Sequence, residues 1–237
     1  MYSFAGEKVL VVGGSSGIGL GTTRVIQDAG ADVTIAGRSK ERLEEARKTI
    51  GDEVATVALD ATDHGAVEKF FAASGAWNHV VASIGKGGRG LIQDLDMGTA
   101  RAAMDAKFWA CFHIARAAEI VTGGSLTFVT GGLGQKPASS ASVLSAVNAA
   151  VEGLTRGLAI DFSPTRVNAV SPGAIDTPLW EQLPPDARKA HYERVAATVP
   201  VKRMGQPEDI GHAILMLMGN PFTTGVVLQV DGGSALL

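Results

Sequence analysis

The sequence predicts an α/β fold in which helices cover both faces of a parallel sheet, the doubly wound architecture. Short apolar runs rich in β-branched residues alternate along the chain with longer amphipathic stretches, and the first run leads directly into a glycine-rich turn. Unbroken apolar runs are typical of strands that are buried on both faces. Regular alternation of strand and helix favours right-handed crossovers and parallel pairing.

The expected elements follow in chain order. Strands are expected at residues 9–12, 33–36, 54–59, 79–83, 125–130, 167–170 and 226–230. Helices are expected at 17–29, 40–50, 66–73, 99–121, 142–162 and 207–218. The polar segment 178–199 interrupts this alternation, and we expect a substrate lid near 178–203. No repeat or linker sets off a second domain, so residues 1–237 are expected to form one domain.

Composition narrows the functional classes. Of 237 residues, 46% are hydrophobic and 19% charged, which predicts a globular chain. The net charge is -3, and the basic residues are scattered, which opposes nucleic-acid binding. Cys111 is the single cysteine, so no intramolecular disulfide or zinc-thiolate site is expected, and a reducing, cytoplasmic location fits. The apolar run after Lys8 is too short for a signal peptide or a membrane span, and we expect neither a metal nor a membrane partner.

A phosphate-binding turn is predicted where the first strand ends. The glycines there are spaced G-x-x-x-G-x-G and open the first helix. Glycine allows a tight turn and close backbone approach, and the helix N-terminus presents free N–H groups to a diphosphate. The alternative is a glycine-rich turn that binds nothing. The position after a strand and before a helix favours a dinucleotide site made of Gly13, Ser15, Ser16, Gly17, Ile18 and Gly19.

The tip of the second strand indicates which dinucleotide binds. An acidic residue would be expected there for NAD(H), and this chain has Arg38 followed by Ser39. A guanidinium pairs well with a 2′-phosphate, so we expect NADP(H) in preference to NAD(H), although Arg38 as a solvated residue at the sheet edge is the alternative. At the end of the third expected strand, Asp60 is expected to bind adenine, to cap the following helix, or both. Further cofactor contacts are expected from Ala61, Ser83 and Gly85.

Taken together, these segments resemble the short-chain dehydrogenase/reductase family over nearly the whole chain. The matching pieces are residues 13–19, Asp60 and the segments 166–170, 171–177, 203–209 and 231–233. The resemblance implies a Rossmann-type domain with a seven-stranded parallel sheet and three helices on each face. It also implies that Ile175 and Thr177 hold the nicotinamide carboxamide, with Pro172, Gly173 and Thr130 nearby. A homodimer or homotetramer built on the fourth and fifth helices is implied as well.

The family's catalytic residues are replaced in this chain. The tyrosine that moves the proton corresponds to Leu144, and the lysine one turn later corresponds to Asn148. The orienting serine corresponds to Gly131, and the asparagine of the fourth helix corresponds to Lys107. No shift of alignment restores the pair, because the sequence has no tyrosine between residues 2 and 192 and no lysine between 136 and 189.

Asparagine and lysine have thus exchanged positions between two helices. We hypothesise that Lys107 binds the nicotinamide ribose or a substrate oxygen and donates a proton, with Asn148 orienting it. The alternative makes Lys107 a helix residue whose ammonium reaches solvent and Asn148 an ordinary helix polar residue. Tyr192 in the predicted lid is a weaker candidate, and a role as a surface aromatic is favoured for it.

Two functions remain open at this stage. The first is an NADP(H)-dependent oxidoreductase that transfers hydride to or from a small carbonyl or alcohol, through an atypical proton relay. Apolar residues near the expected pocket favour an apolar substrate. The second is a catalytically inactive NADP(H)-binding sensor or partner subunit, which the loss of the family's tyrosine, lysine and serine favours.

Overall fold

The computed structural model describes residues 3–85 and 87–237. Within them lie seven strands: β1 (Lys8–Val12), β2 (Asp32–Gly37), β3 (Ala55–Ala58), β4 (Trp77–Ala82), β5 (Ile120–Val129), β6 (Arg166–Pro172) and β7 (Val227–Val230). The α-helices described are α1 (Gly17–Asp28), α2 (Lys40–Ile50), α3 (His64–Ser74), α4 (Met97–Met104), α5 (Ala110–Ala117), α6 (Ser142–Asp161), α7 (Pro185–Thr198) and α8 (Pro207–Gly219). The shorter helical segments described are η1 (Asp105–Trp109), η2 (Gly132–Gly134), η3 (Pro178–Gln182) and η4 (Ser234–Leu236).

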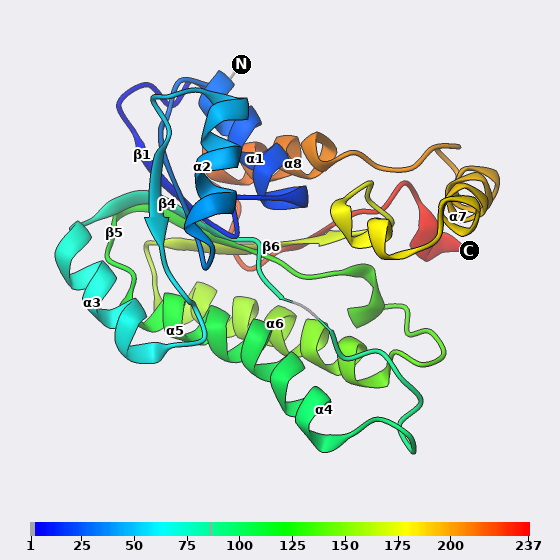
Figure 1. Ribbon diagram of the computed structural model, residues 1–237. Helices are drawn as coiled ribbons and strands as arrows, with labels where there is room; N and C mark the ends of the chain where they lie inside the picture. The colour runs from blue at the N-terminus through cyan, green and yellow to red at the C-terminus, as the bar shows by residue number, and fades with distance from the viewer. Residues whose placement is uncertain (1–2, 86) are drawn as a thin grey trace.

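All the strands pair in parallel, in the order β3-β2-β1-β4-β5-β6-β7 (Figure 1). The chain winds outward in one direction from β1 to β3 and then in the other from β4 to β7. The order therefore reverses between β1 and β4. Ligands of doubly wound sheets bind at the carboxyl ends of the strands beside such a reversal. The predicted seven-stranded parallel sheet with helices on both faces is confirmed.

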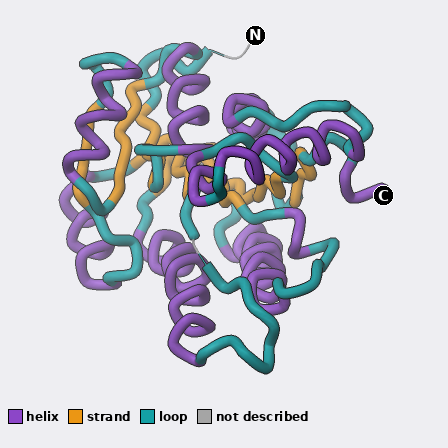
Figure 2. The backbone as a smooth tube through the Cα atoms, turned by 45° about the vertical axis from the view of Figure 1, so that its right-hand side comes forward, coloured by secondary structure: helices purple, strands orange, loops and turns teal. Residues whose placement is uncertain are grey.

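The core has two layers, one on each face of the sheet. Along β1, Val9 and Val11 belong to the core under α1, α2 and α8, whereas Leu10 and Val12 belong to the core under α3, α5 and α6. This alternation with period two explains why the strand is apolar at each position from Val9 to Val12. Figures 1 and 2 show these helices as layers on opposite sides of the sheet. Helix α6 has the length and mean hydropathy of a membrane span, but it packs against β6 as a core helix does.

The prediction of one helix over 99–121 is wrong. The chain is α-helical over α4 and α5, and the π-helical segment η1 joins them. Ala118 is already extended, and Ile120 pairs with Trp77 at the start of β5. The apolar periodicity continues across Ile120 because a buried strand and a buried helix face both require apolar residues there.

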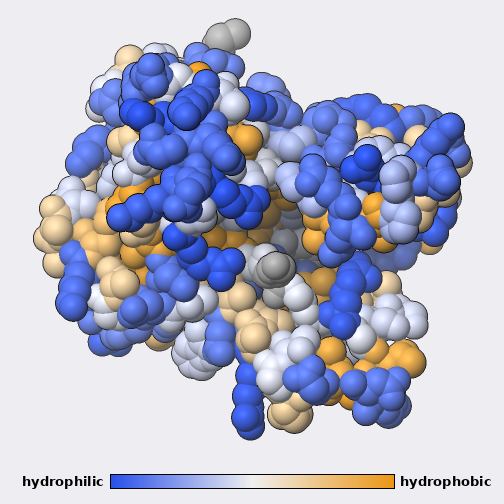
Figure 3. Space-filling view, viewed as in Figure 1, coloured by the Kyte–Doolittle hydropathy of each residue, from blue (hydrophilic) through white to orange (hydrophobic). Residues whose placement is uncertain are grey.

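The segment expected to form a lid folds as η3 and α7. No residue of α7 is buried, and Figures 1 and 2 show this helix standing at one end of the molecule. In Figure 3, apolar surface lies along the recess between α7 and the side of the molecule that carries α1 and α2, and again beneath α7. Leu91, Ile92 and Leu179 are among the exposed large apolar side chains. Closure of this segment over a substrate stays a prediction.

Candidate functional site

The turn after β1 is built so that only glycine fits at two of its positions. Gly13 has φ +86°, and a Cβ there would lie 2.2 Å from the carbonyl oxygen of Ser83. A Cβ on Gly19 would lie 2.0 Å from the carbonyl oxygen of Gly13. The turn therefore packs directly on the end of β4 and on itself, and α1 begins at Gly17 with Ser16 as its cap residue. This backbone cradle at a helix N-terminus fits a diphosphate.

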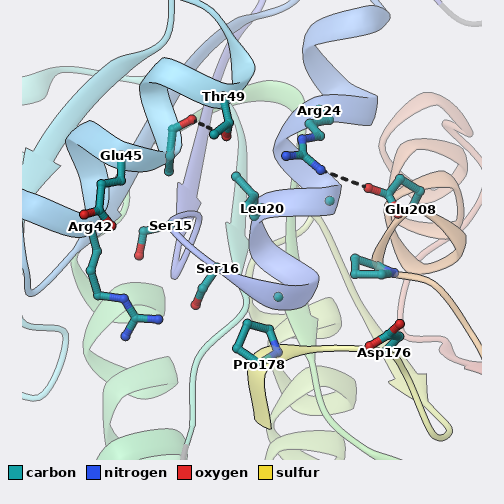
Figure 4. A pocket seen from close by; sticks show the side chains of 14 residues that line it. Ser15, Ser16, Leu20, Arg24, Arg42, Glu45, Thr49, Asp176, Pro178 and Glu208 are labelled. Atoms are coloured by element: carbon teal, nitrogen blue, oxygen red, sulfur yellow. Dashed lines mark hydrogen bonds and ion pairs between the residues drawn. The ribbon is translucent and has the colours of Figure 1, made fainter. Parts of the chain in front are cut away.

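A hollow of about 360 Å³ opens beside this turn, between α1, α2 and the start of α8 (Figure 4). Ser15, Ser16 and Gly17 form one wall, and Arg42 reaches toward them from α2. Sequence reasoning did not single out Arg42. Its only signal was its place in the first turn of α2, where its N–H bonds the hydroxyl of Ser39. A second guanidinium thus stands near the predicted phosphate loop.

The tip of β2 and the end of β3 carry the residues expected at the adenosine. Arg38 is exposed, and its charge acts on Asp60. Burial would raise the pKa of Asp60, but hydrogen bonds from Thr62 and the charge of Arg38 hold it below its ordinary value. The expectation that Asp60 caps the next helix is wrong. Asp63 caps α3 by accepting from Ala66, whereas Asp60 accepts from the N–H and hydroxyl of Thr62 through its Oδ1.

Lys107 lies buried beneath the ends of two strands. Its ammonium donates to the carbonyl oxygen of Thr130, 2.8 Å away, just past the end of β5. Its aliphatic stem is covered by Gly85, past the end of β4, where an added Cβ would lie 2.8 Å from Lys107 Cδ. The alternative in which Lys107 reaches solvent is wrong, because only 8% of the residue is exposed. Lys107 belongs to η1, and single π-helical turns inside α-helices are frequent at functional sites.

Burial lowers the pKa of Lys107 from 10.5 to about 8. Two neighbours oppose this shift, Cys111 one turn along and Glu152 on α6. The thiol itself is inert at neutral pH, because burial raises the pKa of Cys111 to about 12. A lysine with a pKa near 8 is able to give up its proton close to physiological pH.

Asn148 contacts the same loop at the next residue, Gly131. A Cβ on Gly131 would lie 3.1 Å from Asn148 Nδ2, so the glycine at this position leaves room for this amide. Asn148 is 3% exposed, and its Oδ1 has no partner among the described residues. The structure thus brings Lys107 and Asn148 to consecutive residues, Thr130 and Gly131. That Asn148 orients Lys107 stays a prediction.

Sequence reasoning missed a third buried polar side chain, Glu152. It lies one helical turn beyond Asn148 and is 5% exposed. Gly134 in η2 covers it, since an added Cβ would lie 2.8 Å from Glu152 Oε1. Burial raises the pKa of Glu152, while Arg156, Gln135, Thr130 and Lys107 favour its ionised form. The only signal in the sequence was the four-residue spacing of Leu144, Asn148 and Glu152, which places all three on one helix face.

Tyr192 is tied to the loop after β6. Its hydroxyl donates to Asp176, and burial together with that carboxylate raises the pKa of Tyr192 to about 12. Proton donation near neutral pH therefore favours Lys107. Beside Asp176, Ile175 bridges to Gly205, and Thr177 lies where a Cβ on Gly17 would be 3.3 Å away. The loop expected to hold nicotinamide thus adjoins the phosphate turn.

Pro172 and Gly173 anchor this loop to the end of the chain. A Cβ on Gly173 would lie 2.7 Å from the Cα of Asp231, and Pro172 pairs with Val230 in the sheet. Within residues 3–85 and 87–237, no group of three or more His, Cys, Asp or Glu side chains is arranged to hold a metal ion. The site therefore offers a dinucleotide cradle with a buried cation at the carboxyl edge of β4 and β5.

Known proteins share this fold and this cradle. A family model described as Enoyl-(Acyl carrier protein) reductase matches residues 12–235. The chain belongs to the short-chain dehydrogenase/reductase family, whose members are oxidoreductases. Cis-4-hydroxycyclohexanecarboxylate dehydrogenase from Sinomonas cyclohexanicum is 30% identical over 98% of this chain and 97% of the relative.

Two solved structures are similar over their whole length. A small-chain dehydrogenase in complex with NADPH has a TM-score of 0.81 and 30% identity, covering 98% of this chain and 99% of the other. A short chain oxidoreductase from Pseudomonas aeruginosa PAO1, solved with NADPH bound and described as containing an atypical catalytic center, has a TM-score of 0.88 and 26% identity, covering 98% of each chain. A nicotinamide cofactor is therefore the ligand that both the cradle and the family indicate.

Proposed function

We propose that this protein is an NADP(H)-dependent oxidoreductase that transfers hydride to or from a small, mostly apolar carbonyl or alcohol. The observation that carries the proposal is Lys107, a buried ammonium held at the carboxyl ends of β4 and β5. In a doubly wound sheet the dinucleotide lies at the same edge, beside the reversal between β1 and β4. An inert scaffold has no need of a desolvated cation there.

Lys107 supplies the proton that balances the hydride. A bound nicotinamide would supply the hydride for the carbonyl carbon, and the Lys107 ammonium would give its proton to the carbonyl oxygen. The resulting neutral amine is compatible with burial and regains a proton from solvent. The carbonyl of Thr130 fixes the direction of the ammonium through its 2.8 Å hydrogen bond. In the direction of oxidation, the same amine accepts the alcohol proton.

Arg38 is proposed to select the phosphorylated cofactor. It takes the place where an NAD(H) site would have a carboxylate, and its side chain is exposed at the tip of β2. Arg42 adds a second positive charge across the phosphate turn. Substitution Arg38→Ala is expected to weaken NADPH binding by about 10- to 150-fold, the equivalent of about 1.5–3 kcal/mol for a charge-assisted contact. Calorimetry with NADPH and NADH tests this, and equal losses for both would refute the assignment.

The decisive experiment combines turnover with one substitution. Purified protein and NADPH are mixed with a panel of ketones, aldehydes and quinones, and the loss of nicotinamide absorbance is followed. Turnover that disappears in Lys107→Met and persists in Lys136→Ala, an exposed lysine, supports the relay. An unchanged rate in Lys107→Met would refute the role of Lys107 and leave the class of reaction standing.

A second candidate function is an inactive NADP(H)-binding sensor or partner subunit. It is favoured by the replacement of the family's tyrosine, lysine and serine by Leu144, Asn148 and Gly131. Tight NADPH binding with no turnover on any member of the panel would support it. The two functions differ in one physical requirement, since only the enzyme needs a titrating group beside the cofactor.

A further inference from the structure

Three polar side chains on one face of α6 are buried with unused hydrogen-bonding atoms. Ser145 Oγ, Asn148 Oδ1 and Glu152 Oε1 have no partner among the described residues. Their spacing of three and four residues places them in a row along the helix. Buried polar atoms without partners are uncommon in folded proteins, and each one calls for a reason. This row faces the loop that follows β5, where Lys107 also makes its hydrogen bond.

Glycines in the neighbouring loops leave room for the cluster formed by Lys107, Asn148 and Glu152. Gly85 adjoins the Lys107 stem, and Gly134 adjoins Glu152, with an added Cβ 2.8 Å from the nearest atom in both cases. Gly131 adjoins Asn148 in the same way. Any larger residue at Gly85 or Gly134 would have to displace the lysine stem or the carboxylate. The backbone at Gly85 and Gly134 is therefore in close contact with Lys107 and Glu152.

The charges in this cluster are few and opposite. The titratable groups that act on Lys107 are Cys111 on its own helix and Glu152 on α6. Those that act on Glu152 are Arg156, one turn along α6, and Lys107. Cys111 is a neutral thiol at physiological pH, so Glu152 is the neighbouring group that can carry a negative charge beside Lys107. Opposite charges attract strongly where water is excluded.

We propose that Glu152 is the positioning residue for Lys107, and that its carboxylate keeps the buried ammonium protonated and ready to donate. The proposal rests on the proposed function only where it concerns turnover. The loop after β5 lies against both groups, because the carbonyl oxygen of Thr130 accepts from Lys107 and Gly134 packs on the Glu152 carboxylate. Glu152 does not need to touch the substrate. It acts through the charge state of Lys107.

The test measures the titration of Lys107 directly. Protein labelled with ¹³Cε and ¹⁵Nζ lysine is titrated by NMR, and the Lys107 signal is assigned by its loss in Lys107→Met. In Glu152→Gln the pKa of Lys107 should fall by about one pH unit, the effect of removing one nearby opposite charge. Glu152→Asp should restore most of the wild-type value. Asp161→Asn, an exposed carboxylate on the same helix, should leave it unchanged.

Activity provides a second reading that separates this proposal from the proposed function. The alkaline limb of the kcat/KM profile for carbonyl reduction should move to lower pH in Glu152→Gln by the same amount as the NMR titration. If no substrate is turned over, the NMR titration alone still decides whether Glu152 controls Lys107. A Lys107 titration that is the same in wild type and Glu152→Gln overturns the proposal, whatever the activity.

The reciprocal measurement covers the case in which Glu152→Gln fails to fold. The interaction between two titrating groups is the same free energy seen from either side. In Lys107→Met, the pKa of Glu152, followed by ¹³C-labelled glutamate, should therefore rise by about one pH unit. An unchanged Glu152 titration in that variant overturns the proposal equally.

Discussion

Replacing Lys107 by methionine should change how the stability of the protein depends on pH. Methionine has a similar length and no charge, so it fills the space under Gly85 without the ionised group. Burial lowers the pKa of Lys107 from 10.5 to about 8. At about 1.36 kcal/mol per pH unit, keeping this residue charged in the folded state costs about 3 kcal/mol at neutral pH.

The direction of this pH dependence follows from the number of protons that the folded and unfolded states bind. Between pH 8 and pH 10.5 the unfolded chain keeps the lysine proton and the folded protein releases it. Stability rises with pH wherever the unfolded state binds more protons. The wild type should therefore gain about 2 kcal/mol relative to Lys107→Met as the pH rises from about 7 to about 9.5. The titrating groups that do not interact with Lys107 are common to both proteins and cancel in the comparison.

At neutral pH, wild type and Lys107→Met should differ in unfolding free energy by less than the cost of burying the charged lysine. Methionine removes that cost, and it also leaves the carbonyl oxygen of Thr130 without its donor, a loss of about 1–3 kcal/mol. The two effects largely offset each other at pH 7. The pH dependence is therefore the diagnostic quantity, because the carbonyl contribution does not titrate.

Urea unfolding followed by circular dichroism at several pH values gives the two stability curves. A difference in unfolding free energy between the variant and wild type that shifts by about 2 kcal/mol in favour of wild type between pH 7 and pH 9.5 agrees with a charged, desolvated Lys107. A difference that is flat across this range would refute the reasoning, since it would mean that Lys107 titrates in the folded protein as it does in water.

Two further predictions concern the glycines over the site. Gly85→Ala should destabilise the protein by about 1–3 kcal/mol more than Gly87→Ala, because both have positive φ but only Gly85 adjoins Lys107. Urea unfolding measures this, and equal losses would contradict the packing. Gly131→Ser, which introduces the serine that the family resemblance predicts at this position, should cost about 1 kcal/mol or more by crowding Asn148. The cost should shrink in an Asn148→Ala background, and strictly additive losses in this double-mutant cycle would count against the contact.

The sequence was most informative where structure depends on local rules. The phosphate turn was predicted from glycine spacing because the demand for positive φ and close approach arises within seven consecutive residues. The parallel sheet followed from the alternation of strands and helices, and the two-sided burial of β1 followed from its unbroken apolar run. The continuous helix expected over 99–121 was wrong because periodicity does not register a π-helical turn or the early start of β5.

The candidate site was only partly predictable, because burial is a property of the whole fold. Glutamate usually lies on the solvated face of a helix, and nothing in the neighbouring sequence indicates that η2 covers Glu152. Asp60 was expected as a helix cap, yet Asp63 takes that role three residues later. Lys107 was located through its position in the family pattern, whereas its hydrogen bond to Thr130 depends on how far β5 extends.

The physical cost of this cluster bears on the choice between enzyme and sensor. A protein that only bound the cofactor would gain stability by exchanging Lys107, Asn148 and Glu152 for apolar residues of similar volume, since buried charges seldom stabilise a fold. Three glycines, whose backbone freedom is also costly, further adapt the covering loops to these side chains. A carbonyl reductase needs a proton beside its hydride donor, and a desolvated lysine opposed by one carboxylate supplies it near neutral pH. Of the two functions, the enzyme is the one that gives this arrangement a use.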